Sequence, residues 1–115
     1  MTLPPRTDTL ERLAHYHPER IALESYADGR TWSYGELHRL ACGLADHLRN
    51  SFGVQIGDRV AILARNTPFH VVLLCACQKA GWTMVPLNWR LSASELEYLA
   101  RDADASLLIA SDEFA

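Results

Sequence analysis

The stretch that decides the fold runs from residue 59 to residue 86 and reads R-V-A-I-L-A-R-N-T-P-F-H-V-V-L-L-C-A-C-Q-K-A-G-W-T-M-V-P. Its first apolar run, residues 59–64, is short and predicts a strand buried on both faces. Residues 68–80 are apolar on nearly every side, so we expect a deeply placed helix. Residues 82–85 predict a second strand. A strand–helix–strand order of this kind is typical of a parallel sheet.

Turn and capping residues divide this stretch into its elements. Thr67 is a natural helix cap, and Pro68 suits the first helical position, where no amide hydrogen is needed. Gly81 predicts the end of the same helix, because glycine readily adopts the left-handed conformation found there. Both ends of the predicted helix are therefore marked by residues whose conformational preferences suit those positions.

Upstream, the sequence predicts a short helix, a hairpin and a long helix. Asp8 can cap a helix over residues 9–17. Strands at 21–26 and 30–33 flank Asp-Gly, which is a strong hairpin signal. The sequence Ser-Tyr-Gly-Glu at 33–36 matches a capping box, and the apolar spacing after it predicts a helix that frays near Asn50.

Downstream, a second capping box is predicted at Ser92 and Glu95. It opens a helix over 94–103 that should bury Leu96, Leu99 and Ala100, and a last strand follows at 106–110. The whole order predicts a single α/β domain over residues 1–115, with its core at about 8–110. We expect a mostly parallel, three-layer sheet with helices on both faces.

Composition excludes several classes of protein. The chain has 49% hydrophobic and 22% charged residues and a net charge of −3, with acids and bases interspersed. That pattern disfavours a nucleic-acid partner, which would need a clustered basic face. No run reaches the length of a transmembrane segment, and the N-terminus lacks the apolar region of a secretory signal. The odd count of cysteines (Cys42, Cys75 and Cys77) favours a reducing cytoplasm, with all three as small core residues.

No catalytic motif stands out. The sequence contains no glycine-rich nucleotide loop of the dinucleotide or P-loop type and no nucleophile elbow. Its histidines have no partners at the spacing of metal ligands, so we predict neither catalytic nor metal-binding residues. The chemistry most visible in the sequence is instead at two turns that follow predicted strands.

Those turns are Arg65-Asn66-Thr67 and Pro86-Leu87-Asn88-Trp89-Arg90. Ligands of parallel α/β sheets collect outside the carboxyl ends of the strands, where both turns should lie. The Asn88 side chain can bond the backbone two residues on and so hold its turn, which leaves Arg90 free to point outward. Trp89 is interpreted as an apolar lid over the core, with a stacking platform as the alternative.

Three blocks in order carry a family resemblance: T-W-S-Y-G-E-L-H-R-L-A-C-G-L-A-D-H-L (31–48), G-V-Q-I-G-D-R-V-A-I-L-A-R-N (53–66) and K-A-G-W-T-M-V-P-L-N-W-R-L-S-A-S-E-L (79–96). Together they resemble the N-terminal region of adenylate-forming enzymes, the superfamily of acyl-CoA synthetases, peptide-synthetase adenylation domains and luciferases. The W-R-L-S-x-x-E-L ending is most similar to bacterial fatty-acyl or aryl-acid CoA ligases.

The resemblance implies an enzyme that uses ATP and Mg²⁺ to convert a carboxylic acid to an acyl-adenylate and then to an acyl-CoA thioester. It also implies that the ATP loop, the acyl pocket and the mobile C-terminal domain lie in a remainder of the parent enzyme. We therefore expect this chain to be an N-terminal subdomain that binds no cofactor of its own and is inactive alone.

By the same resemblance, Arg90 is the candidate contact for a phosphate of CoA. Alternatively, Arg90 pairs with a carboxylate such as that of Glu95. The alternative function is a free-standing α/β binding or interaction module without catalysis. If the chain is an excised piece, the strand 106–110 exposes an unpaired edge, and we expect self-association.

Overall fold

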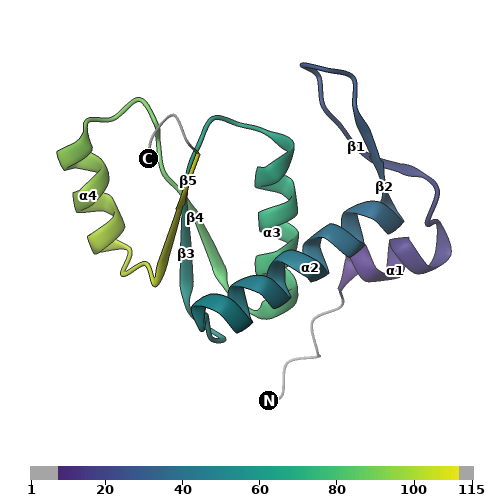
Figure 1. Ribbon diagram of the computed structural model, residues 1–115, viewed down its shortest axis with the longest axis horizontal. Coiled ribbons are helices and arrows are strands. Elements are labelled where there is room, and N and C mark those ends of the chain that lie inside the picture. The colour runs from purple at the N-terminus through teal and green to yellow at the C-terminus, as the bar shows by residue number, and fades with distance from the viewer. Residues whose placement is uncertain (1–7, 112–115) are drawn as a thin grey trace, which may run out of the picture.

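The structure, a computed structural model, describes residues 8–111 as a parallel α/β layer with an attached hairpin and short helix (Figure 1). In chain order the elements are α1 (Thr9–Tyr16), β1 (Ile21–Glu24), β2 (Thr31–Ser33), α2 (Tyr34–Phe52), β3 (Arg59–Leu63), α3 (Pro68–Ala80), β4 (Thr83–Pro86), α4 (Ala93–Asp102) and β5 (Leu107–Ala110). The predicted elements are all present, with boundaries moved by up to two residues.

Two separate sheets form. The hairpin strands β1 and β2 pair antiparallel, while β4, β3 and β5 form a parallel sheet with β3 in the middle. Val60 of β3 lies in register with Met84 of β4 on one side and Leu107 of β5 on the other. The predicted α/β class and mostly parallel sheet are therefore confirmed.

The strand order explains why helices cover both faces. The chain steps from β3 to β4 through α3 and then returns past β3 to β5 through α4. Because parallel crossovers are right-handed, a reversal of direction places the second helix on the opposite face. Figure 1 shows α3 and α2 on one side of the sheet and α4 on the other.

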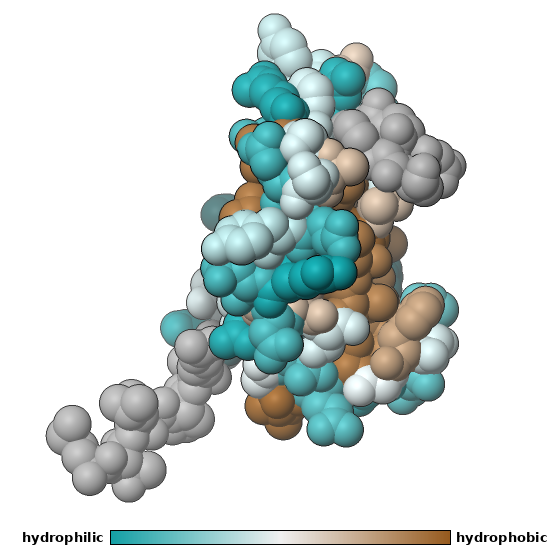
Figure 2. Space-filling model, turned by 90° about the vertical axis from the view of Figure 1, so that its left-hand side faces the viewer, coloured by the Kyte–Doolittle hydropathy of each residue, from teal (hydrophilic) through white to brown (hydrophobic). Residues whose placement is uncertain are grey.

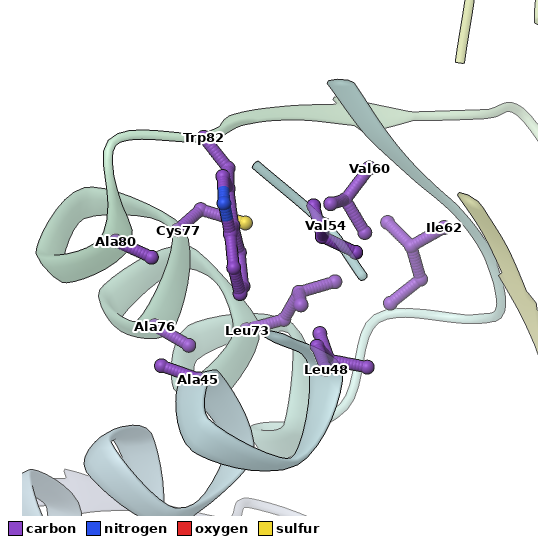
Figure 3. Close-up of a cluster of buried hydrophobic side chains, with 10 residues drawn as sticks. All are labelled: Ala45, Leu48, Val54, Val60, Ile62, Leu73, Ala76, Cys77, Ala80 and Trp82. Carbon is purple, nitrogen blue, oxygen red and sulfur yellow. The ribbon is translucent and has the colours of Figure 1, made fainter. Parts of the chain in front are cut away.

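Successive side chains of β3 point to opposite faces of the sheet, as in any β-strand. Val60 and Ile62 enter a core cluster with α2 and α3, whereas Ala61 and Leu63 enter a second cluster with α4. Figure 3 shows the first cluster, in which Leu73 of α3 points between the helices and β3. The prediction that β3 is buried on both faces is confirmed.

Local signals set the helix ends. The Ser33 hydroxyl accepts the Glu36 N–H, and the Glu36 carboxylate accepts the Ser33 N–H, both at 3.1 Å, which confirms the first capping box. However, α2 runs through Phe52, where a loop was expected. The helix ends at Gly53, whose φ of +68° is a left-handed conformation that costs glycine little. The helical conformation therefore extends through Phe52, the residue before this glycine.

Three predictions about burial and capping need correction. Leu99 is 37% exposed, because only Leu96 and Ala100 of α4 turn toward the second cluster. At the second predicted capping box, the Ser92 hydroxyl accepts the Glu95 N–H at 3.3 Å, which confirms the cap. The Glu95 carboxylate, however, accepts the Ser92 hydroxyl at 2.9 Å, and the described contacts include no bond from the Ser92 N–H to this carboxylate. The helix α3 is less deep than expected, since α2 and the sheet cover one side only and Leu74 is 41% exposed on the other.

The cysteines are all free thiols, but only Cys77 is fully in the core. Burial raises the pKa of Cys77 to about 11 and also raises that of the half-buried Cys75. Cys42 is half-buried as well, so the prediction of three core cysteines holds strictly for one. Within residues 8–111, no helix is both long enough and apolar enough to cross a membrane.

One apolar hollow remains open on the α4 side of the sheet. It has a volume of about 560 Å³ and is lined by Leu63, Leu87, Leu96, Ala100 and Leu108, with polar residues at its rim. Figure 2, which views this side of the molecule, shows hydrophobic surface running beside hydrophilic side chains. The edge strand β5 contributes Leu108, which is 51% exposed.

Candidate functional site

The strand order also fixes where a ligand crevice can form. The turn after β3 leads to α3 on one face of the sheet, whereas the turn after its neighbour β4 leads to α4 on the other face. The carboxyl ends of two such strands diverge into a crevice, which is the usual ligand position in open α/β sheets. In this chain that position lies between β3 and β4, at the two turns singled out in the sequence.

The turn after β4 is held by its own asparagine. The Asn88 side-chain oxygen accepts the Arg90 N–H at 3.0 Å, as predicted, and the Asn88 carbonyl accepts the Leu91 N–H at 3.1 Å. These two bonds satisfy backbone donors that no longer belong to a strand or helix. They fix the backbone at Arg90, whose side chain lies at the exposed surface.

Trp89 joins the two turns. Its half-buried ring packs against the cluster of Ala61, Leu63 and Leu87, so the prediction of an apolar lid is confirmed. The ring also receives two guanidinium groups, with the central carbon of Arg65 at 4.3 Å and that of Arg90 at 4.9 Å from the ring centre. The alternative interpretation as a stacking platform stays a prediction.

Arg90 does not use the carboxylate suggested by the sequence. In the described part of the chain Arg90 forms no ion pair, and Glu95 instead accepts the Ser92 hydroxyl. The exposed guanidinium lies over the Trp89 ring. The contact of Arg90 with a phosphate of CoA stays a prediction.

A small apolar hollow lies beside Arg65 at the same edge of the sheet. Its volume is about 380 Å³, and its walls include Ile62, Phe69 and Ile109. Such a site offers apolar contact next to a cationic rim, which suits an amphipathic anion. The sequence predicts that these residues lie near strand ends. Which of them meet depends on the order of the strands in the sheet.

The structure also contains a polar cluster far from this edge that sequence spacing did not reveal. The Lys79 ammonium, near the end of α3, lies 2.5 Å from a carboxylate oxygen of Asp8 and 2.8 Å from Nδ1 of His38. These partners are 71 and 41 residues away in the chain. Among residues 8–111, no group of three His, Cys, Asp or Glu side chains could hold a metal ion.

Comparison with known proteins gives consistent matches over nearly the whole chain. A model of the family described as AMP-binding enzyme matches residues 10–115. The feruloyl-CoA synthase of Amycolatopsis sp is 45% identical over 104 residues, which are 90% of this chain and 21% of that protein. The fatty acid–[acyl-carrier-protein] ligase of Streptomyces coeruleorubidus is 35% identical over 112 residues, 96% of this chain and 21% of that protein.

Solved structures give the same result for the fold. The unliganded O-succinylbenzoate coenzyme A synthetase of Bacillus subtilis superposes with a TM-score of 0.86 at 29% identity, covering 96% of this chain and 24% of that one. The chain thus spans about a fifth of the length of the curated relatives it matches.

Proposed function

The chain belongs to the AMP-binding enzyme family, and we propose that it forms the N-terminal part of an ATP-dependent ligase that joins a carboxylic acid to CoA. The observation that carries this proposal is the family match over residues 10–115, together with the position of Arg90 at the ligand edge of the sheet. Relatives named as feruloyl-CoA synthase and fatty acid ligase support an aryl or acyl carboxylic acid as the substrate class.

The proposed reaction has two half-reactions. In the first, the carboxylate attacks the α-phosphate of ATP, forming the acyl-adenylate and releasing pyrophosphate. In the second, the CoA thiol attacks the acyl carbon and AMP leaves. Mg²⁺ bound with ATP would supply neutralisation of phosphate charge in the first step. The residues described here contribute to the second step, through the edge of the sheet that carries Arg90.

Arg90 is proposed to contact a phosphate of CoA. A guanidinium offers planar, paired donors that match phosphate oxygens, and its charge does not titrate near neutral pH. The Asn88 bond fixes the backbone at this residue, so the side chain starts from a defined position. Arg90 belongs to no ion pair among the described residues, so contact with a phosphate would break none.

The test separates the two half-reactions in the full ligase that contains this chain. We expect Arg90→Ala to raise the CoA concentration needed for thioester formation and to leave acid-dependent pyrophosphate exchange unchanged. Arg101→Ala is the matched control, since Arg101 is an exposed arginine paired with Glu97 on α4. Equal loss of both half-reactions in Arg90→Ala would show that the residue is structural.

We further propose that residues 1–115 do not turn over alone and act as a scaffold for the remainder of the parent enzyme, in the cytoplasm. The three free thiols support a reducing compartment. The purified chain, mixed with ATP, Mg²⁺ and a panel of acyl and aryl acids, should release no pyrophosphate. Detectable release would overturn this part of the proposal.

The intact mass of the protein in its source cell distinguishes a ligase from a free-standing binding module. A mass several-fold above 12.9 kDa supports the ligase, whereas a mass of 12.9 kDa supports a module without catalysis.

A further inference from the structure

The Arg90 side chain is held at a second point besides its backbone. The Asn88 side chain accepts the Arg90 N–H, which fixes where the side chain begins. The guanidinium at the far end lies over the Trp89 ring, 4.9 Å from its centre. An exposed arginine normally loses considerable rotamer freedom when it binds a ligand, and a residue held at both ends has less to lose.

The Trp89 ring is a rigid support. It packs against Ala61, Leu63 and Leu87, which are at most 8% exposed and belong to the core on the α4 side. The Arg65 guanidinium, from the turn after β3, lies 4.3 Å from the same ring centre. The ring is therefore fixed by the core beneath it and by the neighbouring turn.

The arrangement holds positive charge together at the crevice. Two guanidinium groups that share one ring are no more than about 9 Å apart, at a separation where like charges repel weakly in water. The negative face of an indole attracts both cations and offsets this repulsion. A ligand with several phosphates gains from such a site more than a neutral or singly charged one.

We propose that Trp89 is a positioning residue, which holds the Arg90 guanidinium ready for a phosphate of CoA. This inference rests on the proposed CoA contact of Arg90 and adds the residue that prepares it. Trp89 acts through Arg90 and does not itself have to touch the ligand. A flat guanidinium stacks on the ring, whereas a lysine ammonium would keep the charge and lose both the stack and the paired donors.

The first measurement detects the stack without a ligand, by NMR of the arginine Nε–H groups in the 115-residue chain. The indole ring current should displace the Arg90 signal from its random-coil position. We expect Trp89→Met to remove this displacement and Trp89→Phe to retain most of it. Trp32→Met is the matched control, because Trp32 carries Arg30 at the same distance of 4.9 Å on the hairpin.

The second measurement uses the full ligase that contains this chain, with the same substitutions. It is titrated with CoA, and with pantetheine as a probe that lacks the nucleotide phosphates. We expect Trp89→Met to weaken CoA binding about two- to fivefold, the size of one exposed cation–π contact. Pantetheine binding should not change. Trp89→Phe and Trp32→Met should bind CoA like the wild-type ligase, and Arg90→Lys should bind more weakly.

The outcomes separate the two proposals. If Arg90→Ala weakens CoA binding while Trp89→Met and Arg90→Lys bind normally, the positioning role is wrong and the Arg90 contact stands. If Arg90→Ala binds CoA like the wild-type ligase, the CoA contact itself fails and the positioning role with it. If Trp89→Met does not fold, Arg90→Lys still tests the stacked guanidinium, because residue 90 is exposed.

Discussion

Replacing Lys79 by methionine tests how the N-terminal helix is attached to the rest of the domain. The Lys79 ammonium contacts the Asp8 carboxylate at 2.5 Å and Nδ1 of His38 at 2.8 Å. Asp8 is also the N-cap of α1, and its side chain accepts the Glu11 N–H. One ammonium group therefore connects the start of α1 with α2 and α3.

The contact with His38 gives the ammonium group a second partner. An ammonium group can only donate hydrogen bonds, so Nδ1 of His38 is the acceptor in this contact. Cys42 also lies near this ring, with its sulfur 3.7 Å from Nε2.

Burial sets the expected magnitude for Lys79→Met. The side chains of Lys79 and Asp8 are 10% and 30% exposed, which places the pair between the surface and the interior. Exposed pairs contribute about 0.2–1 kcal/mol, whereas removing one partner of a fully buried pair costs about 3–5 kcal/mol. We expect the free energy of unfolding to fall by about 1–2 kcal/mol, since methionine retains the apolar stem of lysine and loses its charge.

The sign of the pH dependence follows from Asp8. Burial raises the pKa of its carboxyl group, but the Lys79 hydrogen bond, the Glu11 N–H and nearby positive charge together hold the pKa below the ordinary value of 3.8. A depressed carboxyl pKa gives stability that is present above 3.8 and lost as the pH falls through the lower folded value. The difference between wild type and Lys79→Met should therefore be full above 3.8 and should shrink as the pH falls below this value.

Urea unfolding followed by circular dichroism measures this difference, with Asp8→Asn and the double variant completing a mutant cycle. Arg101→Met is the matched control, because Arg101 and Glu97 are also 2.5 Å apart but are 79% and 62% exposed. We expect the control to change stability by less than about 0.5 kcal/mol. Equal stability losses in Lys79→Met and Arg101→Met, or additive effects of the Asp8 and Lys79 variants, would refute the reasoning.

Three further substitutions test the core, a helix start and the open edge. Leu73→Ala should lower the free energy of unfolding by about 2–5 kcal/mol, because Leu73 is fully buried; a loss below about 1 kcal/mol in urea unfolding would contradict its place in the core. Ser33→Ala should cost about 1 kcal/mol by removing the cap of α2, and Ser33→Asp should restore most of it in the same assay. We propose that the chain self-associates through the β5 edge, so Leu108→Lys should lower the average mass in analytical ultracentrifugation, and a wild-type chain that stays monomeric at all concentrations would exclude this.

The sequence by itself determined the elements of this protein and their order. Capping at Ser33 and Glu36, the glycine stop at Gly81 and the apolar periods act within a few residues, so they can be read without a fold. The Asn88 bond to the Arg90 backbone is local in the same sense, and its prediction was confirmed. The order of strands and helices was then enough to predict a parallel sheet covered on both faces.

Only the tertiary structure decided which distant side chains meet. The placement of β3 between β4 and β5 brings Arg65 and Trp89 to one crevice, although no local rule relates their positions. The contact of Lys79 with Asp8 spans 71 residues and depends on how α1 and α3 pack against α2. The same packing leaves Leu74 and Leu99 exposed, because an apolar residue is buried only where another element arrives to cover it.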